Sequence, residues 1–225
     1  MGPDETTSRA RQRMVDLQIA GRGIRDPYVL AAMREVPREA FVAEGFEQFA
    51  YEDGALPIGA GQTISQPYIV ALMIEAAGIE PGDVVLEVGA GSGYAAAVMG
   101  RIAKTVYGIE RHASLAEEAR SRLAALGYDN VAIEVGDGTR GWPEKAPFDA
   151  ILVAAGAPEV PGALKQQLAI GGRLVIPVGG DEGQTLRKIT RVAEDRYEEE
   201  NLGGVAFVPL IGEHGWTEDR RRTLR

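Results

Sequence analysis

The sequence contains no cysteine and only two histidines, His112 and His214. Without cysteine, disulfide bonds, zinc–thiolate sites and thiol catalysis are excluded. Two histidines are too few to form a metal site by themselves, so we expect no bound metal. Nothing in the sequence places either histidine opposite a reacting group, and we expect both to be surface or capping residues.

A basic surface and a long apolar run are also missing. The net charge is −9, and a nucleic-acid partner would require a basic surface that neutralises phosphates. No apolar run approaches the roughly 20 residues of a membrane helix, and the N-terminus lacks the apolar core of a signal peptide. We therefore expect a cytoplasmic monomer with no nucleic-acid or membrane partner. The dense basic cluster at the end of the chain is expected to be a solvated tail: Arg220, Arg221, Arg222 and Arg225.

From about residue 80 the sequence alternates between short apolar runs and helical segments. Runs typical of buried parallel strands lie at 83–89, 105–110, 130–137, 148–155 and 171–179, with helical patterns at 94–103, 114–127 and 160–172. This alternation predicts an α/β fold with a doubly wound, mostly parallel, Rossmann-like sheet. The segments 185–202 and 203–210 are expected to add a C-terminal antiparallel hairpin.

Helices are expected before this core. The segment 6–20 carries an apolar stripe of Met14, Val15, Leu17 and Ile19. Asp26 and Pro27 are typical of a helix start, and another helix should run from Pro67 to Gly78. We expect one domain over 1–225, with an N-terminal helical extension over 1–79, a core over 80–216 and a tail over 217–225.

The segment "LEVGAGSGY" (86–94) places three alternating glycines between a predicted strand and a predicted helix. Gly89, Gly91 and Gly93 would let the backbone approach a ligand at the switch point of the sheet. A tight turn without a ligand is the simpler alternative.

Acidic residues around this loop indicate which ligand it binds. Tyr94 stands where a dinucleotide fingerprint has Gly or Ala, and Glu87 would repel a pyrophosphate. A carboxylate there favours a ligand with ammonium and sulfonium groups, S-adenosylmethionine. Glu110 ends the next strand and could accept from both ribose hydroxyls, while Asp137 ends the third and could accept from the adenine amino group. Alternatively, Glu110 and Asp137 cap the following helices.

The methyl acceptor is indicated by what the site lacks. The end of the fourth strand reads "VAAGAP", which has no side chain to accept from an amine, and no general base is evident. A carboxylate, with a reference pKa near ~4, needs no base at neutral pH and can be held by neutral donors. The charge-free segment "LPIGAGQTISQPYIV" (56–70) offers hydroxyls and amides of this kind. An ordinary turn, with Ser65 as the N-cap of the helix at Pro67, is the alternative.

Several motifs together resemble the protein-L-isoaspartate (D-aspartate) O-methyltransferase family, over about 9–216. The most specific block is "TISQP"; the others are "QRMVDLQ", "DPYVLAAMREVPREAFV", "AYEDGALPIGAGQTISQPYIVA", "VLEVGAGSGYAAAVM", "VYGIERH", "GDGTRGWPEKAPFDAI", "GGRLVIPVG" and "FVPLIGEHGW". The resemblance implies a class I S-adenosylmethionine-dependent methyltransferase fold. It also implies a repair enzyme that esterifies the free carboxylate of isoaspartyl residues in damaged proteins, after which the ester converts to succinimide.

The same resemblance implies the site residues. Ser65 is the expected catalytic hydroxyl, and 1–79 the part that binds substrate. The implied substrate-binding residues are Leu56, Pro57, Ile58, Thr63, Ile64, Val208, Pro209 and Leu210, the last three on a strand that could otherwise be simple core. The implied cofactor-binding residues, for S-adenosyl-L-methionine or its product S-adenosyl-L-homocysteine, are Glu87, Gly89, Ala90, Gly91, Gly93, Glu110, Arg111, Asp137 and Gly138. Gly156 departs from the family's "VTAAAP" and would make that loop more flexible.

Two other functions remain open at this point. One is methylation of a small-molecule carboxylate or hydroxyl, which a buried base near Ser65 or a closed pocket would favour. The other is a binding module with a Rossmann-type sheet, either inactive or specific for a dinucleotide.

Overall fold

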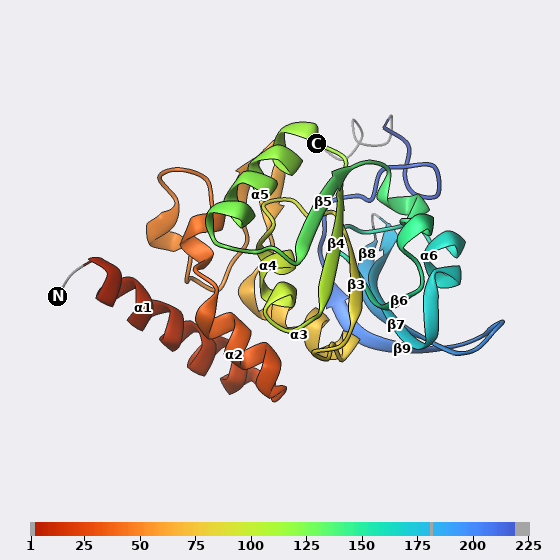
Figure 1. The fold of residues 1–225 in the computed structure, drawn as a ribbon, viewed down its shortest axis with the longest axis horizontal. Helices are drawn as coiled ribbons and strands as arrows, with labels where there is room; N and C mark the ends of the chain where they lie inside the picture. The colour runs from red at the N-terminus through yellow and green to blue at the C-terminus, as the bar shows by residue number, and fades with distance from the viewer. Residues whose placement is uncertain (1–2, 181, 219–225) are drawn as a thin grey trace.

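The computed structural model describes residues 3–180 and 182–218, and a seven-stranded sheet forms the centre of this part of the chain (Figure 1). The strand order is β5-β4-β3-β6-β7-β8-β9, parallel through β7 and antiparallel at β8 and β9. The predicted doubly wound sheet is therefore confirmed. The strands are β3 (Val84–Val88), β4 (Thr105–Glu110), β5 (Val131–Val135), β6 (Phe148–Val153), β7 (Leu168–Gly180), β8 (Gly183–Ala193) and β9 (Arg196–Val205).

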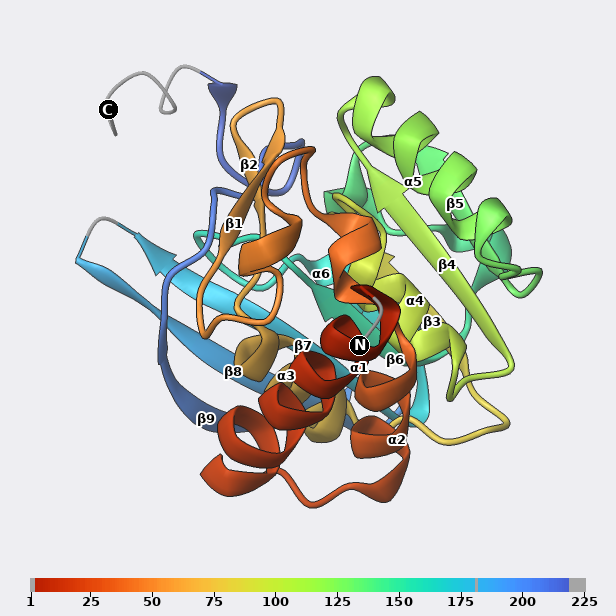
Figure 2. The ribbon, with the colours of Figure 1, turned by 90° about the vertical axis from the view of Figure 1, so that its left-hand side faces the viewer.

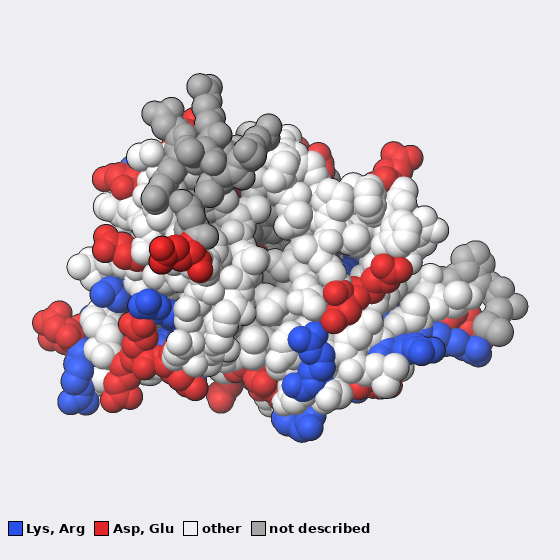
Figure 3. All heavy atoms as spheres, turned by 180° about the vertical axis from the view of Figure 1, so that it is seen from behind, with Lys and Arg blue, Asp and Glu red and all other residues white. Residues whose placement is uncertain are grey.

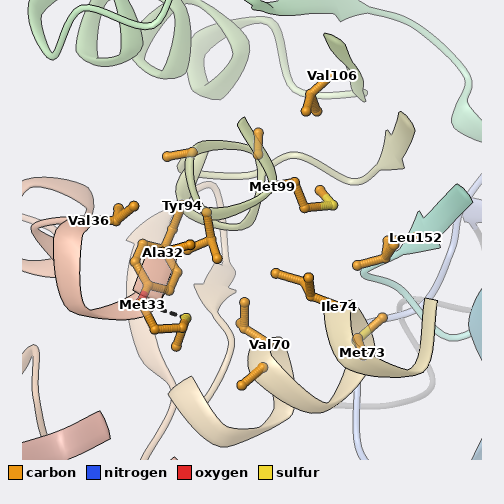
Figure 4. Close-up of a cluster of buried hydrophobic side chains, with 14 of the residues drawn as sticks. Ala32, Met33, Val36, Val70, Met73, Ile74, Tyr94, Met99, Val106 and Leu152 are labelled. Carbon is orange, nitrogen blue, oxygen red and sulfur yellow. Dashed lines mark hydrogen bonds between the residues drawn. The ribbon is translucent and has the colours of Figure 1, made fainter. Parts of the chain in front are cut away.

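Both faces of the sheet are covered, which explains why its central strands read as continuous apolar runs. On β3, Val85 faces a core shared with the N-terminal helices, whereas Leu86 faces a second core on the other side. Figure 4 shows part of the first core, where side chains of the α2, α3 and α4 helices meet those of β4 and β6. The helices are α1 (Pro3–Arg13), α2 (Pro27–Glu35), α3 (Pro67–Ala77), α4 (Tyr94–Gly100), α5 (Ala113–Ala125) and α6 (Gly162–Gln166).

The N-terminal helices begin and end largely where local chemistry predicts. Asp26 accepts hydrogen bonds from the N–H groups of Tyr28 and Val29 at the start of α2, and Gly78 ends α3 with φ of 57°. One expectation fails, because Leu17 is 59% exposed. It lies in a π-helical segment, Met14–Ile19, whose wider turn rotates Leu17 away from the buried face of Met14. Short 3₁₀ turns lie at Ala20–Arg22, Arg38–Phe41, Glu47–Phe49, Gly138–Arg140 and Pro143–Lys145.

The sequence-based boundaries are wrong in the last third of the chain. The expected helix over 160–172 ends at Gln166, because Leu168 already pairs with Phe148 of β6. The segment 185–202 contains most of β8, the turn and most of β9, so it forms most of the hairpin by itself. The expected strand over 203–210 leaves the sheet after Val205, where the Gln184 side chain bonds both the N–H and the carbonyl of Phe207.

A small antiparallel hairpin lies where the sequence suggests only a loop. The β1 strand (Leu56–Gly59) pairs with β2 (Gln62–Ile64), and the turn between them has positive φ at Gly59, Ala60 and Gly61. Figure 2 shows this hairpin rising above the N-terminal helices at one end of the sheet. No described helix is long and apolar enough to span a membrane.

Candidate active site

A cavity of about 780 Å³, counting the open space at its mouth, lies where β3, β4 and β6 end. The glycine loop forms one part of its wall, and β2 with Ser65 and the segment 208–211 form another part. Figure 3 shows the side opposite to Figure 1, which is hollowed near its centre and mostly uncharged around the hollow. Most of the sequence-predicted site residues line the cavity: Thr63, Ile64, Ser65, Glu87, Gly89, Ala90, Gly91, Glu110, Arg111, Gly138, Val208, Pro209 and Leu210.

The three glycines of the loop serve two purposes. All three have positive φ, between 53° and 86°, a region that favours glycine. Gly89 and Gly91 line the cavity, whereas Gly93 does not. A Cβ on Gly93 would lie 3.3 Å from both Ala119 and Leu123 of α5, so this glycine allows α4 and α5 to pack closely.

Glu87 places a carboxylate in the floor of the cavity. Its side chain is 1% exposed, and its Oε2 atom has no hydrogen-bond partner among the described residues. Burial, and then the nearby charge of Glu110, raise the pKa of Glu87 well above its usual value. A buried carboxylate oxygen without a partner is costly, so this position is suited to a cationic group of a ligand.

Glu110 joins the end of β4 to the glycine loop. Its Oε2 accepts from the N–H of Gly91 at 2.9 Å, and its Oε1 accepts from the N–H of His112 at 2.8 Å. It does not cap α5, whose N-cap is His112, a residue that makes no side-chain capping hydrogen bond there. Each carboxylate oxygen keeps a second lone pair, so Glu110 is held rigidly and can still accept from a ligand in the cavity.

Asp137 does not line the cavity, although Gly138 beside it does. One carboxylate oxygen accepts from the N–H and hydroxyl of Thr139, and the other accepts from the N–H of Glu213 at 2.8 Å. Burial alone would raise the pKa of Asp137, but these hydrogen bonds lower it below its usual value. Asp137 therefore caps the 3₁₀ turn at Gly138–Arg140, as the alternative interpretation of the sequence predicts. It also holds the segment 212–214 in place. His214 donates its N–H to Thr139 in the same arrangement.

The β1 residues expected at the substrate do not themselves line the cavity. Leu56 pairs with Ile64 and Pro57 pairs with Thr63, so β1 supports the strand that lines the cavity. Ile58 packs against the glycine loop, where a Cβ on Gly91 would lie 3.1 Å from its Cδ1 atom.

Ser65 presents its hydroxyl to the cavity without capping a helix. The N-cap of α3 is Gln66, which makes no side-chain cap hydrogen bond. The Ser65 carbonyl accepts from Arg38 at 2.9 Å, and its hydroxyl has no hydrogen-bond partner in the described part of the chain. The helix-cap interpretation of Ser65 is therefore wrong.

Gly156 is firmly held, contrary to expectation. Its N–H donates to Val208 and its carbonyl accepts from Leu210, both at 2.8 Å, and from the Trp216 indole at 2.9 Å. A Cβ at Gly156 would lie 2.4 Å from the Gln184 amide. This glycine therefore leaves room for the Gln184 side chain, which bonds the backbone of Phe207.

Sequence reasoning missed part of the lining. Tyr94 appeared only as a departure from the dinucleotide pattern, yet its ring is buried and lines the cavity. The other missed lining residues are Gln62, Val70, Val88, Ser92, Ala95, Ile109, Ala154, Ala155 and Ile211. Most are apolar or small, so no local chemical signal marks them. No group of His, Asp and Glu suited to a metal ion occurs within residues 3–180 and 182–218.

Comparisons with known proteins agree with this geometry. The family model of the protein-L-isoaspartate(D-aspartate) O-methyltransferases matches residues 9–215. The chain is 60% identical over 207 residues to protein-L-isoaspartate O-methyltransferase 2 of Pelobacter propionicus, covering 92% of both chains. A solved protein-L-isoaspartate O-methyltransferase aligns with a TM-score of 0.83 and 30% identity, covering 95% of this chain and 70% of the other. The Plasmodium falciparum protein-L-isoaspartate O-methyltransferase, solved with S-adenosyl-L-homocysteine, aligns with a TM-score of 0.78 and 29% identity, covering 89% of this chain and 98% of the other. The chain therefore belongs to the protein-L-isoaspartate(D-aspartate) O-methyltransferase family.

Proposed function

We propose that this chain transfers a methyl group from S-adenosylmethionine to the free carboxylate of isoaspartyl residues in damaged proteins and peptides. The observation that carries the proposal is the division of one cavity wall into two unlike parts. The part around the glycine loop has carboxylates that suit a cationic donor, and the Thr63–Ser65 part has hydroxyls and no charged residue, which suits an anionic acceptor. Family membership supports the same reaction.

The buried carboxylates fit the donor. The partnerless Oε2 of Glu87 is available to an ammonium group, and Glu110 is positioned to accept from ribose hydroxyls. The other proposed cofactor-binding residues are Gly89, Ala90, Gly91, Arg111 and Gly138. When bound, S-adenosylmethionine supplies a methyl group on a cationic sulfur. Gly93 contributes through helix packing, and Asp137 through the segment that it anchors.

The acceptor side needs alignment more than proton transfer, because a carboxylate is already ionised at neutral pH. We assign Ser65 as the hydroxyl that orients this carboxylate, with Thr63 and Ile64 beside it. Val208, Pro209 and Leu210 form the part of the wall that faces the substrate main chain, and β1 residues Leu56, Pro57 and Ile58 support the wall from behind.

A groove beside the cavity supports a peptide substrate over a small molecule. The groove shares Thr63, Ser65, Ala154 and Val208 with the cavity and extends along 204–207. A small-molecule hydroxyl would also need a base, and among the described residues that line the cavity or the groove there is no histidine. The monomeric state and the cytoplasmic location stay predictions from the sequence, and the arginine tail lies outside the described residues.

The direct test uses two peptides that differ only in an aspartyl or isoaspartyl linkage. We expect methyl incorporation into the isoaspartyl peptide and almost none into the other, because only the isoaspartyl linkage leaves the α-carboxylate free. Equal labelling of both peptides, or of neither, would overturn the proposed function. Calorimetry with S-adenosylhomocysteine and with NAD separates the binding-module alternative, which predicts that NAD binds.

Replacing Glu87 by glutamine should have opposite effects on stability and on cofactor affinity. Because the pKa of Glu87 is raised in the folded protein, the folded state binds more protons than the unfolded chain. Its contribution to the free energy of unfolding therefore decreases as pH rises above the usual pKa of 4.5. Glutamine does not ionise, so Glu87→Gln avoids this pH-dependent loss of unfolding free energy. At pH ~8 the ligand-free variant should therefore melt at least roughly 2 °C above the wild type.

The same variant should bind S-adenosylhomocysteine about tenfold more weakly, since a charge-assisted hydrogen bond is lost. Thermal unfolding at pH ~5 and ~8, with calorimetric titration, measures both effects, and the stability difference should shrink at the lower pH. Glu134→Gln, an exposed change on β5, is the control. A variant that binds the ligand as tightly as the wild type would contradict the assignment of Glu87.

A further inference from the structure

Arg38 is a fully buried cation one layer behind the cavity wall. Its exposure is 0%, and no described carboxylate lies within 4.0 Å of its guanidinium group. Burial lowers its pKa from the usual value, but an arginine side chain stays charged in proteins. Burying a charge without a charged partner costs several kcal/mol. A purely structural connection could use a neutral side chain and avoid this cost.

Arg38 donates to the carbonyls of Ser65 and Gly54, which line the cavity or the groove, and to that of Ala50, which lines neither. Its Nη2 donates to the Ser65 carbonyl at 2.9 Å, and its Nε donates to the Ala50 carbonyl at 2.8 Å. The guanidinium also lies 4.8 Å from the centre of the Tyr94 ring, which lines the cavity at the start of α4. Arg38 therefore connects the Ser65 backbone to the helix that follows the glycine loop.

One nitrogen of Arg38 is left without a partner. Nη1 is buried and makes no hydrogen bond among the described residues. The Tyr94 hydroxyl donates to the Met33 sulfur at 3.6 Å (Figure 4), and its oxygen can still accept from the guanidinium side. The groups around this positive charge are carbonyls and an aromatic ring instead of a carboxylate, so in a low-dielectric interior its field extends to the neighbouring wall.

We propose that Arg38 is a positioning residue that fixes the Ser65 backbone and whose buried charge selects an anionic acceptor. The proposal rests on the proposed function and assigns a source of acceptor selectivity within it. A cation in direct contact with the acceptor carboxylate would reduce its nucleophilicity. Placed behind a neutral wall, the same charge attracts the anion while hydroxyls and amides alone touch it.

The test compares binding of two peptides to the complex of the protein with S-adenosylhomocysteine. One peptide carries an isoaspartyl residue, and the other carries the same residue with its free carboxylate converted to a carboxamide. The ratio of the two dissociation constants measures selection for charge without any turnover. The ratio is measured for the wild type, Arg38→Met and Arg38→Lys.

Arg173→Met is the matched control. Arg173 also donates to carbonyls at a turn, those of Ala77 and Gly78 at the end of α3, but it does not line the cavity or the groove. Its loss should lower thermal stability and leave the ratio unchanged.

We expect the wild type to prefer the carboxylate peptide by at least about tenfold, and Arg38→Met to lose most of this preference while keeping its S-adenosylhomocysteine affinity within about twofold. Arg38→Lys should keep the preference but methylate at least about tenfold more slowly, since a lysine ammonium cannot reproduce the geometry of the guanidinium.

An unchanged ratio in Arg38→Met, or a wild type without a preference, would overturn the proposal. If Arg38→Met does not fold, Arg38→Lys decides alone, and a wild-type methylation rate would overturn the positioning role. Failure of the proposed function would show separately, as equal methylation of aspartyl and isoaspartyl peptides by the wild type.

Discussion

Glu110→Ala is expected to weaken S-adenosylhomocysteine binding by at least about 100-fold. The substitution removes the proposed acceptor of two ribose hydroxyls, and each charge-assisted hydrogen bond contributes about 1.5–3 kcal/mol. It also leaves the N–H groups of Gly91 and His112 without their acceptor, so the glycine loop should lose its connection to β4. Isothermal titration calorimetry measures the affinity, and thermal unfolding measures the accompanying loss of stability.

Glu134→Ala is the control for Glu110→Ala. Glu134 is exposed on β5 and pairs with Ile109, the residue that precedes Glu110 on β4. Both glutamates therefore lie near the carboxyl ends of neighbouring strands. The Glu134→Ala variant should bind S-adenosylhomocysteine like the wild type. Unchanged affinity in Glu110→Ala itself would contradict the assignment of Glu110 to the ribose.

Ser65→Ala is expected to show the opposite profile. The methylation rate of an isoaspartyl peptide should fall by at least about tenfold, because the acceptor carboxylate loses a donor that aligns it. The affinity for S-adenosylhomocysteine should stay within about twofold, since Ser65 lines the cavity from outside the glycine loop and the strand ends that carry Glu87 and Glu110. Stability should change little, because the hydroxyl has no partner among the described residues and caps no helix.

Steady-state kinetics and calorimetry on the same samples distinguish the two parts of the wall. Ser114→Ala, an exposed change on α5, controls for removing a hydroxyl elsewhere. A large loss of cofactor binding in Ser65→Ala would place Ser65 in the donor half of the site instead.

Features whose cause is local could be predicted from the sequence. The start of α2 needs only Asp26 and Pro27, and the glycine loop needs only positive φ at three positions between a strand and a helix. The parallel sheet follows from runs that are apolar on both faces. For the same reason Glu87 and Glu110 could be placed at the cavity, since parallel strands end at one edge of the sheet.

Features that depend on distant segments could not be predicted. Asp137 has the expected position on the chain, but its carboxylate is taken by the N–H of Glu213, far along the sequence. Arg38 looks like an ordinary charged residue, and only folding shows that it is buried among carbonyls of other segments. The strand expected over 203–210 is interrupted by the Gln184 side chain, a contact without a sequence signal.

The contact of Ile58 with Gly91 joins the donor and acceptor halves of the enzyme. Position 91 favours glycine for its φ of 53°, and a side chain there would also push against Ile58 of the β1 strand. A substitution at this position would thus disturb the peptide side of the site as well as the loop it belongs to. This contact provides a route for energetic coupling between the two ligands of this enzyme, and any such coupling is reciprocal, so that each ligand alters the affinity for the other by the same factor.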